Sequence, residues 1–378
     1  PLLSADTLRD LVDRHVADGN GATVLTAELD DPSGYGRIVR SGDGAVRSIV
    51  EHKDADDTTL RITEINSGIY AFDADVLRAG LDRITTDNAQ GELYLTDVLG
   101  FAHDDGRRVG ALVTDDVWQT EGVNDRVQLA ALHGELNRRV TTRWMRAGVT
   151  IVDPSTTWID VTVTLGRDVT IRPGVQLHGS TTVGEGAQVG PDCTLRDTVV
   201  GPNAEVFRTH AIGAEIGARA TVGPFSYLRP GTRLGEKGKI GGFVETKKAE
   251  IGDGSKVPHL SYVGDATIGD GVNIGAGTIV ANYDGVDKHH TTVGDHTFVG
   301  SDSVLVAPVE LADGCYVAAG STVTSGTEPG ELAVARARQH NIPGWVERKR
   351  PGTPTDEAAR RANARQTEDD GVGEGSDQ

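Results

Sequence analysis

An aliphatic residue recurs every six positions over a long central part of the chain. The clearest series are Leu165, Ile171, Leu177, Val183, Val189 and Leu195; Ile216, Val222, Leu228, Leu234 and Ile240; and Val293, Val299, Leu305, Leu311, Val317 and Val323. A helix repeats every 3.6 residues and a half-buried strand every two, so neither keeps a period of six on one face. A fixed short period is typical of a solenoid, in which each rung buries its apolar residues against its neighbours. The pattern predicts a triangular parallel β-helix in which three six-residue units make one coil.

Glycine commonly follows the recurring aliphatic residue. We expect this glycine to supply a tight corner, where a side chain would strain the backbone. The period also shifts phase at several points, and residues 282–290 form an insertion between two series. Solenoids often carry function on such insertions.

The residues before the β-helix predict a different fold. Short apolar stretches alternate with helical ones across residues 1–124, as in a layered α/β domain with helices on the faces of a sheet. Ser4 is a suitable N-cap for the first helix. The expected strands are 22–29, 36–40, 46–52, 65–72 and 109–113, and the expected helices are 7–16, 76–84 and 93–103.

A linker helix and a tail complete the predicted organisation. Residues 125–148 have helical periodicity, and the β-helix domain then extends over residues 149–347. Residues 348–378 offer little to bury, so we expect a disordered tail. The apolar face of the linker helix would consist of Val127, Leu129, Leu132, Leu136 and Val140.

Composition and charge narrow the class of protein. Glycine accounts for 49 of the 378 residues and aromatic residues for 4%, as suits narrow coils. The formal net charge of −19 argues against a nucleic-acid partner or a membrane surface, and no apolar run is long enough for membrane insertion. Cys193 and Cys315 lie far apart in the sequence, so we expect two reduced thiols in a cytoplasmic protein.

Polar side chains concentrate in the later coils. Neighbouring rungs of a solenoid lie roughly 5 Å apart, so Lys247, His259 and Asn273 could gather on one face. Arginine and lysine suit a phosphate, and histidine suits the removal of a proton from an attacking amine. These residues alone leave open a surface histidine and lysines that protect a strand edge. The full set is Arg229, Glu245, Lys247, Lys248, His259, Tyr262, Asn273, Asn282, Tyr283 and Lys288.

Six segments of these coils carry a family resemblance. They are GPFSYLRPGT (223–232), GFVETKKA (242–249), VPHLSYVGDA (257–266), NIGAGT (273–278), NYDG (282–285) and GSD (300–302). They resemble the acetyltransferase half of the bacterial bifunctional family that joins glucosamine-1-phosphate N-acetyltransferase to N-acetylglucosamine-1-phosphate uridyltransferase. The resemblance implies a left-handed β-helix, acetyl transfer from acetyl-CoA to glucosamine 1-phosphate, and a homotrimer whose subunits share active sites.

The same resemblance implies roles for individual residues. His259 would be the general base on the sugar amine. Glucosamine 1-phosphate would be bound by Arg229, Lys247, Tyr262 and Asn273. Acetyl-CoA would be bound by Ala276, Asn282, Tyr283, Ser301, Ala319 and Arg336, and Glu245 and Lys288 match further active-site positions.

Residues 1–124 resemble the second half of the family's uridyltransferase domain, a Rossmann-like nucleotidyltransferase fold, in segments 34–38, 49–53, 64–70, 92–97 and 121–124. The resemblance implies that Gly36, Glu51, Asn66 and Asn124 contact UTP or UDP-N-acetylglucosamine and that Asn124 ligates Mg²⁺. The family's Gly-rich phosphate loop and second metal-binding Asp are not in this sequence. We therefore expect a truncated copy with acetyltransferase activity and without uridyltransferase activity.

Three other functions stay open at this point. The first is a sugar-phosphate nucleotidyltransferase whose β-helix only regulates or oligomerises. The second is a zinc β-helix enzyme of the carbonic anhydrase kind, which needs three converging histidines, and the third is a scaffold without activity. The candidate zinc ligands are His259, His289, His290 and His296.

Overall fold

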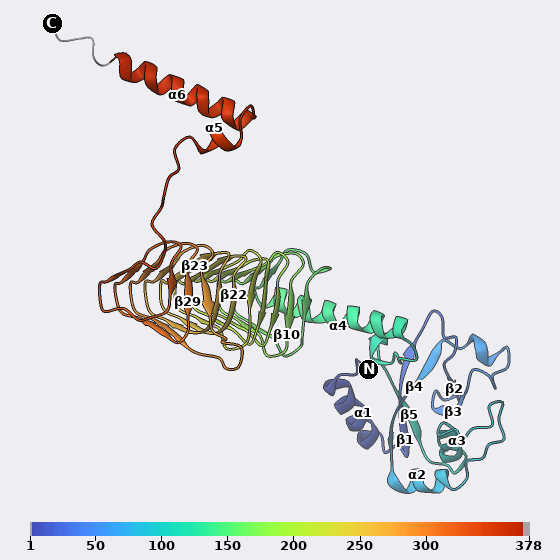
Figure 1. Ribbon diagram of the computed structural model, residues 1–378. Helices are drawn as coiled ribbons and strands as arrows, with labels where there is room; N and C mark the ends of the chain where they lie inside the picture. Colours follow the sequence, from blue (N-terminus) through green and yellow to red (C-terminus); the bar gives the residue numbers. More distant parts are fainter. Residues whose placement is uncertain (1, 373–378) are drawn as a thin grey trace. The chain divides into compact units, whose positions relative to one another are not determined.

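The computed structural model describes residues 2–372 of the chain (Figure 1). Contacts within the chain define two compact units, Pro1–Phe243 and Val244–Gln378. None of the helices in the described part of the chain combines the length and apolar character that a membrane span requires.

The first part of unit 1 is a five-stranded sheet in the order β3-β2-β4-β1-β5. β1 lies inside it, antiparallel to β4 and parallel to β5, which explains why its residues are apolar almost throughout. Val24, Ile38, Ile49 and Leu99 are buried in one core between the sheet and α3. The strands lie close to their predicted bounds: β1 (Ala22–Glu28), β2 (Arg37–Arg40), β3 (Val46–Val50), β4 (Glu64–Phe72) and β5 (Val109–Val113).

The predicted helices of this part are present, but one of them, α3, begins later in the sequence than predicted. The Ser4 hydroxyl caps α1 by accepting a hydrogen bond from the Thr7 amide at 3.0 Å. α3 begins later than predicted because Asn88 holds residue Glu92 in a turn, donating to its carbonyl and accepting from its amide. The elements are α1 (Ala5–Ala17), η1 (Thr59–Arg61), α2 (Ala74–Leu81), α3 (Asp97–Asp104) and η2 (Val117–Gln119).

Helix α4 (Arg126–Arg146) occupies most of the predicted linker. Its apolar face was predicted correctly only in the second half: Val127 is 79% exposed and Leu129 40% exposed, whereas Leu132 and Val140 are buried. Polar contacts decide which side faces inward. The Asn137 side chain donates to the Thr157 carbonyl at 2.7 Å and accepts from the Ile159 amide at 3.1 Å, so it fastens α4 to the first coil.

The coils of unit 1 are parallel and in register, with each inward residue stacked on its counterpart, as Leu177 is on Leu195. One side of the triangle consists of β6 (Thr150–Ile151), β9 (Thr170–Ile171), β12 (Gln188–Val189), β15 (Glu205–Val206), β18 (Thr221–Val222) and β21 (Lys239–Gly242). The second consists of β7 (Trp158–Ile159), β10 (Gln176–His178), β13 (Thr194–Arg196), β16 (Thr209–Ile212) and β19 (Ser226–Leu228). The third consists of β8 (Thr164–Leu165), β11 (Thr182–Val183), β14 (Val199–Val200), β17 (Glu215–Ile216) and β20 (Arg233–Leu234).

Unit 2 continues the same parallel pattern. β22 (Glu245–Ile251) and β24 (Tyr262–Ile268) are long strands that each extend over two sides. One side carries β23 (Lys256–His259), β25 (Asn273–Ile274), β28 (Phe298–Val299), β31 (Tyr316–Val317) and β33 (Leu332–Ala333). The other strands are β26 (Ile279–Ala281), β29 (Val304–Val306) and β32 (Thr322–Val323) on the second side, and β27 (Thr291–Val293) and β30 (Val309–Leu311) on the third.

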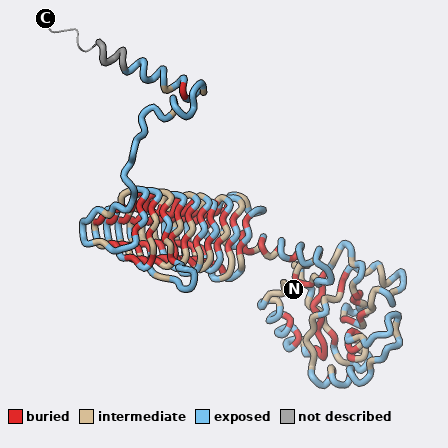
Figure 2. Tube along the Cα trace, in the orientation of Figure 1, coloured by how far each residue is buried: buried red, intermediate tan, exposed pale blue. Residues whose placement is uncertain are grey.

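The predicted inward residues of both units are buried, as the red bands of Figure 2 show. This confirms a parallel β-solenoid of hexapeptide repeats after the α/β part, consistent with a left-handed β-helix. Cys193 and Cys315 are free, buried thiols inside the coils, as expected. Burial raises the pKa of Cys193 to about 11, so this thiol is protonated and unreactive near neutral pH.

The glycine behind the inward aliphatic residue has another reason than the predicted one. A Cβ on Gly275 would lie 2.5 Å from the backbone nitrogen of Ser301, and one on Gly300 would lie 2.5 Å from that of Ala319. Neither glycine has a left-handed φ; the left-handed corner comes later, at Asp302 (φ 55°). The prediction of a glycine corner is therefore wrong at these positions, where glycine lets consecutive coils pack closely.

The predicted disordered tail, residues 348–378, contains more structure than expected. The Thr353 hydroxyl accepts a hydrogen bond from the Asp356 amide at 3.4 Å, and Asp356 pairs with Arg360 at 3.2 Å. The segment has few large apolar residues but is rich in good helix formers, and it forms helices where disorder was predicted. The helices are α5 (Trp345–Lys349) and α6 (Pro354–Val372), and residues 373–378 lie outside the described residues.

Candidate active site

Five polar side chains of unit 2 form a compact group, the lysine cluster: Lys247, Tyr262, Asp265, Asn282 and Lys288. β22 supplies Lys247 and the parallel β24 supplies Tyr262 and Asp265, with Lys247 in register with Gly264. Asn282 follows β26 and begins the insertion that carries Lys288. The repeat therefore places the first three residues, and the insertion adds the other two.

The contacts within the lysine cluster are short and shielded from solvent. The Lys247 ammonium lies 3.7 Å from the Asp265 carboxylate, and the two side chains are only 14% and 16% exposed. The Asn282 amide nitrogen donates to Asp265 at 2.5 Å and lies 3.5 Å from the Tyr262 hydroxyl. Asp265 was not among the residues predicted from the sequence; it lies in the segment 257–266 that resembles the family, but this gave no sign of a role because aspartate also occurs at ordinary corners.

Lysine crowding makes this cluster suitable for an anion. The pKa of Lys288 lies below its usual range, first because of its hydrogen bond with Lys247 and then because the two charges repel each other. Lys248 adds a smaller repulsion and Asp265 a compensating attraction. A bound phosphate would relieve the repulsion between these lysines.

The insertion that carries Lys288 is itself folded. Tyr283 forms a β-bridge with Lys288, and its hydroxyl donates to the Gly285 carbonyl at 2.7 Å. The Asp284 carboxylate lies 2.7 Å from the His289 ring, and this hydrogen bond lowers the pKa of Asp284. The His289 amide donates to the Asn282 carbonyl at 2.8 Å and closes the loop. Lys288 is thus presented by a defined turn.

Four predicted residues follow one another along a single edge of the coils, the corner ladder: His259, Ala276, Ser301 and Ala319. Hydrogen bonds to their carbonyl oxygens from the next coil link them: Gly277 to His259 at 3.2 Å, Asp302 to Ala276 at 2.8 Å and Gly320 to Ser301 at 2.8 Å. Arg336 continues the series by donating to the Ala319 carbonyl at 2.9 Å. Sequence positions far apart therefore form one continuous strip.

His259 is the last residue of β23, at the end of one side of the triangle and three residues before β24 begins. Its backbone is fixed, because its carbonyl accepts from the Gly277 amide and, at 2.7 Å, from the Ser261 hydroxyl. Its side chain is exposed. The imidazole can therefore meet a substrate on the surface of the coils.

Asn273, another predicted sugar-phosphate residue, lies on a different side of the triangle from Lys247. Asn273 is on β25, in register with Lys256 and Phe298, whereas Lys247 is on the side formed by β22 and β24. The prediction that Lys247, His259 and Asn273 share one face is wrong for Lys247, because the paired strands β23 and β25, which carry His259 and Asn273, form a different side of the triangle. Arg229 follows β19 in unit 1, where the Thr232 hydroxyl donates to its carbonyl at 2.8 Å.

Three predicted uridine residues, Gly36, Glu51 and Asn66, form a second group in unit 1 together with Tyr70 and Thr96; we call it the nucleotide cluster. A Cβ on Gly36 would lie 3.3 Å from both Glu51 carboxylate oxygens, and the Asn66 amide donates to the Gly36 carbonyl at 2.9 Å. The Tyr70 and Thr96 hydroxyls donate to the Asn66 side chain at 3.0 Å and to Glu51 at 3.3 Å. Tyr70 and Thr96 were missed by sequence reasoning.

The carboxyl group of Glu51 is desolvated. Burial is the main cause that raises its pKa; the Thr96 hydrogen bond opposes the shift and the charges of Asp54 and Asp97 add to it. Burial also raises the pKa of Tyr70 to about 12. A buried carboxyl group of this kind suits the hydroxyl donors of a sugar.

Asn124, the predicted magnesium ligand, is exposed, and its backbone amide donates to the Gln128 side chain at 2.6 Å. Within residues 2–372 no three His, Cys, Asp or Glu side chains come together as metal ligands would. One amide oxygen does not make a magnesium site, so the described residues do not fit this metal by themselves. The same finding removes the basis for a zinc site formed by His259, His289, His290 and His296.

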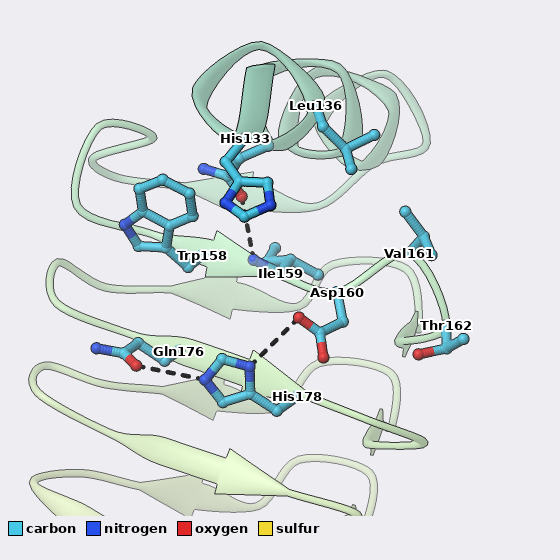
Figure 3. Close-up of a pocket in the computed structure, with 10 residues that line it drawn as sticks. His133, Leu136, Trp158, Ile159, Asp160, Val161, Thr162, Gln176 and His178 are labelled. Carbon is cyan, nitrogen blue, oxygen red and sulfur yellow. Dashed lines mark hydrogen bonds and ion pairs between the residues drawn. The ribbon is translucent and has the colours of Figure 1, made fainter. Parts of the chain in front are cut away.

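A cavity of about 580 Å³ lies elsewhere, between α4 and the first coils of unit 1 (Figure 3). Figure 3 shows His178 between Asp160 and Gln176, at 3.3 Å from each, with His133 of α4 nearby. None of the residues predicted to act on a substrate lines this cavity. The predicted general base of unit 2, His259, instead has an exposed side chain.

Comparisons with known proteins place both parts of the chain. Residues 2–161 match the Nucleotidyl transferase family, and residues 290–325 match the bacterial transferase hexapeptide (six repeats) family. The bifunctional protein GlmU of Corynebacterium efficiens is 58% identical over 359 residues, which are 95% of this chain and 74% of that protein. The chain belongs to the GlmU family. The bifunctional protein GlmU of Streptomyces avermitilis is 59% identical over 95% of this chain and 75% of its own length.

A solved structure, the UDP-N-acetylglucosamine acyltransferase from Campylobacter jejuni, aligns with 58% of this chain and 84% of that chain, at 21% identity and a TM-score of 0.35. The GlmU relationship is much closer. It agrees with the acetyltransferase activity that the sequence predicts and with the resemblance to the uridyltransferase half of the family, and it disfavours a β-helix that serves only regulation or a scaffold.

Proposed function

We propose that the coils of unit 2 transfer the acetyl group of acetyl-CoA to the amine of glucosamine 1-phosphate, with His259 as general base. One observation carries the proposal: His259 begins the corner ladder of predicted acetyl-CoA residues and also adjoins β24, which supplies the lysine cluster. The proposal keeps residues 1–124, 125–148 and 149–347 as uridyltransferase, linker and acetyltransferase domains.

In the proposed reaction the sugar amine attacks the thioester carbonyl directly. A nitrogen–carbon bond forms, the carbon–sulfur bond breaks, and CoA leaves as its thiolate. His259 accepts the proton that the amine loses, and this proton then neutralises the thiolate. The fixed backbone of His259 reduces the freedom of the imidazole relative to the acetyl-CoA strip.

The substrates would divide between the two groups of residues. The crowded ammonium groups of Lys247 and Lys288 would bind the sugar phosphate, with Arg229, Tyr262 and Asn273 as further ligands. Ala276, Ser301, Ala319 and Arg336 would contact acetyl-CoA along the ladder, with Asn282 and Tyr283 from the insertion. This division follows the positions of the residues on the coils.

The proposal is tested by release of CoA thiol from acetyl-CoA in the presence of the purified chain and glucosamine 1-phosphate. Product should appear with this acceptor and be much slower with glucosamine 6-phosphate, because the phosphate is then displaced from the lysine cluster. A folded chain that binds acetyl-CoA but acetylates neither sugar would contradict the proposal.

The nucleotide cluster favours a second function, the binding of a uridine nucleotide. Gly36, Glu51 and Asn66 converge, and Glu51 offers a desolvated acceptor for sugar hydroxyls. Magnesium would be held by the substrate phosphates, with Asn124 as one protein ligand. Calorimetric titration with UDP-N-acetylglucosamine tests this: Glu51→Ala should weaken binding, whereas Glu28→Ala, on β1 and exposed, should not.

The proposed assembly is a homotrimer whose subunits share active sites. Two features of unit 2 support it: the open position of His259, and the exposed stacked rings of Phe298 and Tyr316, whose centroids lie 5.5 Å apart. Light scattering should give the mass of three chains. A mass of one chain with full acetyl transfer would overturn the assembly and leave the chemistry standing.

A further inference from the structure

Asp265 is the common partner of two residues that serve different substrates. Its carboxylate accepts from the Asn282 amide at 2.5 Å and lies 3.7 Å from the Lys247 ammonium. In the proposed function Lys247 binds the sugar phosphate and Asn282 lies with acetyl-CoA. Asp265 therefore connects the two substrate-binding groups.

The backbone conformation at Asp265 directs its side chain towards the lysine cluster. Asp265 is left-handed (φ 48°), and Lys248 of the adjacent coil is left-handed too (φ 44°); both lie at one corner, between the register pairs Lys247–Gly264 and Ala249–Ala266. Aspartate enters this conformation at small cost. The corner thus aims a carboxylate at the cluster from a rigid part of the coil.

The Asn282 amide would have two orientations without this carboxylate. Asn282 is only 7% exposed, so its amide nitrogen needs an acceptor, and Asp265 and the Tyr262 hydroxyl are the acceptors near it. Because the nitrogen faces Asp265, the amide oxygen of Asn282 faces the other way. A charged acceptor fixes this orientation more strongly than a neutral one.

The charges of the lysine cluster also favour a positioning role for Asp265. Lys247 and Lys248 both repel Lys288, and Asp265 attracts it. Three ammonium groups and one carboxylate leave an excess of positive charge for a phosphate. The carboxylate lowers that excess, so its presence weakens rather than strengthens anion binding, and a role in positioning explains it better than a role in affinity.

We propose that Asp265 is a positioning residue of the acetyltransferase site, which holds the Asn282 amide and the Lys247 ammonium in the orientation needed for transfer. This inference rests on the proposed acetyl transfer. According to this proposal, Asp265 raises the turnover rate but does not strengthen the binding of the sugar phosphate.

The test uses the full chain and substitutions that keep the left-handed backbone. Asp265→Gly removes the carboxylate, and Asp265→Asn keeps an uncharged acceptor; Asp168→Gly and Asp168→Asn are matched controls at an exposed left-handed corner (φ 58°). Misplaced groups cost up to about 10²-fold in rate. We expect kcat to fall about tenfold in Asp265→Gly and less in Asp265→Asn, without a rise in KM for glucosamine 1-phosphate.

A double-mutant cycle shows whether Asp265 acts through Asn282. If it does, Asn282→Ala with Asp265→Gly should lose little more kcat than Asn282→Ala alone. Additive losses would overturn the proposal, as would a kcat for Asp265→Gly within twofold of that for Asp168→Gly. A joint rise of both KM values together with a loss of secondary structure would also overturn it, since that is the sign of a merely structural role.

A measurement that does not depend on catalytic activity can test this inference separately from the proposed function. Hydrogen exchange of the Asn282 side-chain amide, followed by NMR, should become about tenfold faster in Asp265→Gly and stay unchanged in Asp168→Gly. Unchanged exchange in Asp265→Gly would refute the positioning role. Failure of the unsubstituted chain to acetylate glucosamine 1-phosphate, with faster exchange in Asp265→Gly, would refute the proposed function alone.

Discussion

The lysine cluster and the nucleotide cluster each contain a carboxyl group, and the two groups differ in what surrounds them. Asp265 is paired with Lys247 and Asn282. Glu51 is desolvated, with the Thr96 hydroxyl as its donor and further carboxylates around it. The first environment suits an anionic substrate held by excess lysines, and the second suits the hydroxyl groups of a sugar nucleotide.

The scaffolds of the two clusters differ as well. In unit 2, parallel coils in register place residues directly above one another, so the corner ladder follows from hydrogen bonds between consecutive coils. In unit 1, Asn66 lies on β4, whereas the other residues lie just outside elements: Gly36 before β2, Glu51 after β3 and Thr96 before α3. A repeating scaffold gives a linear site, and a sheet gives a convergent one.

Removal of the base is expected to have the largest effect. His259→Ala should lower acetyl transfer by about 10²-fold or more, because the proposed general base is lost, while acetyl-CoA still binds. His296→Asn, at an exposed left-handed corner of unit 2, is the control. Steady-state kinetics and calorimetry of acetyl-CoA binding test this prediction. Near-normal turnover of His259→Ala would show that His259 is not the general base.

Close packing between coils is the next feature to test, since the ladder depends on it. Gly300→Ala would force a Cβ to within 2.5 Å of the Ala319 nitrogen, and overpacking of this kind costs about 1–3 kcal/mol. Gly314→Asn is the control, because Gly314 is left-handed with nothing within 4 Å and asparagine tolerates this conformation. Thermal unfolding measures both; equal, small losses would contradict close packing as the reason for Gly300.

Removal of a residue that binds the phosphate should raise the KM of one substrate only. Lys247→Ala should raise KM for glucosamine 1-phosphate about tenfold or more and change KM for acetyl-CoA much less, because the ammonium group would contact only the phosphate. Arg229→Ala should behave in the same way, and Lys239→Ala, exposed on β21, should change neither. Equal rises for both substrates would indicate damage to the fold instead.

The smallest expected effect is on how stability depends on pH. It tests the contrast between carboxyl groups in different surroundings, Glu51 first. Glu51 has a raised pKa in the folded chain, so its contribution to stability is present below the usual value of 4.5 and is lost as the pH rises through the folded value. Glu51→Gln should therefore raise the Tm of unit 1 by a few degrees at neutral pH and change it little in acid.

Glu135 supplies the opposite case within unit 1. Hydrogen bonds from Arg138 first, and then from Arg139, lower the pKa of Glu135 to about 2. Its contribution is present above 4.5 and is lost as the pH falls towards 2, so Glu135→Gln should lower Tm at neutral pH and less so in acid. Tm profiles with the same sign for both variants would show that the two environments do not differ as described.

The sequence determined the solenoid and its inward residues, because a period of six admits few other structures and apolar side chains must be buried. It also placed the strands of unit 1, whose alternation is a local property. The family motifs identified most residues of the lysine cluster and the corner ladder, although the six-residue period alone could not assign them to a substrate.

Only the tertiary structure decided which of these residues meet. Asn273 and Lys247 lie on different sides of the coil, Asp265 joins the cluster from a corner, and Gly300 serves close packing between coils. The outer half of α4 is exposed although its pattern is apolar, because Asn137 fixes the helix to the first coil. Such contacts depend on register and side-chain direction between segments distant in the chain, and a local pattern of polar and apolar residues contains neither.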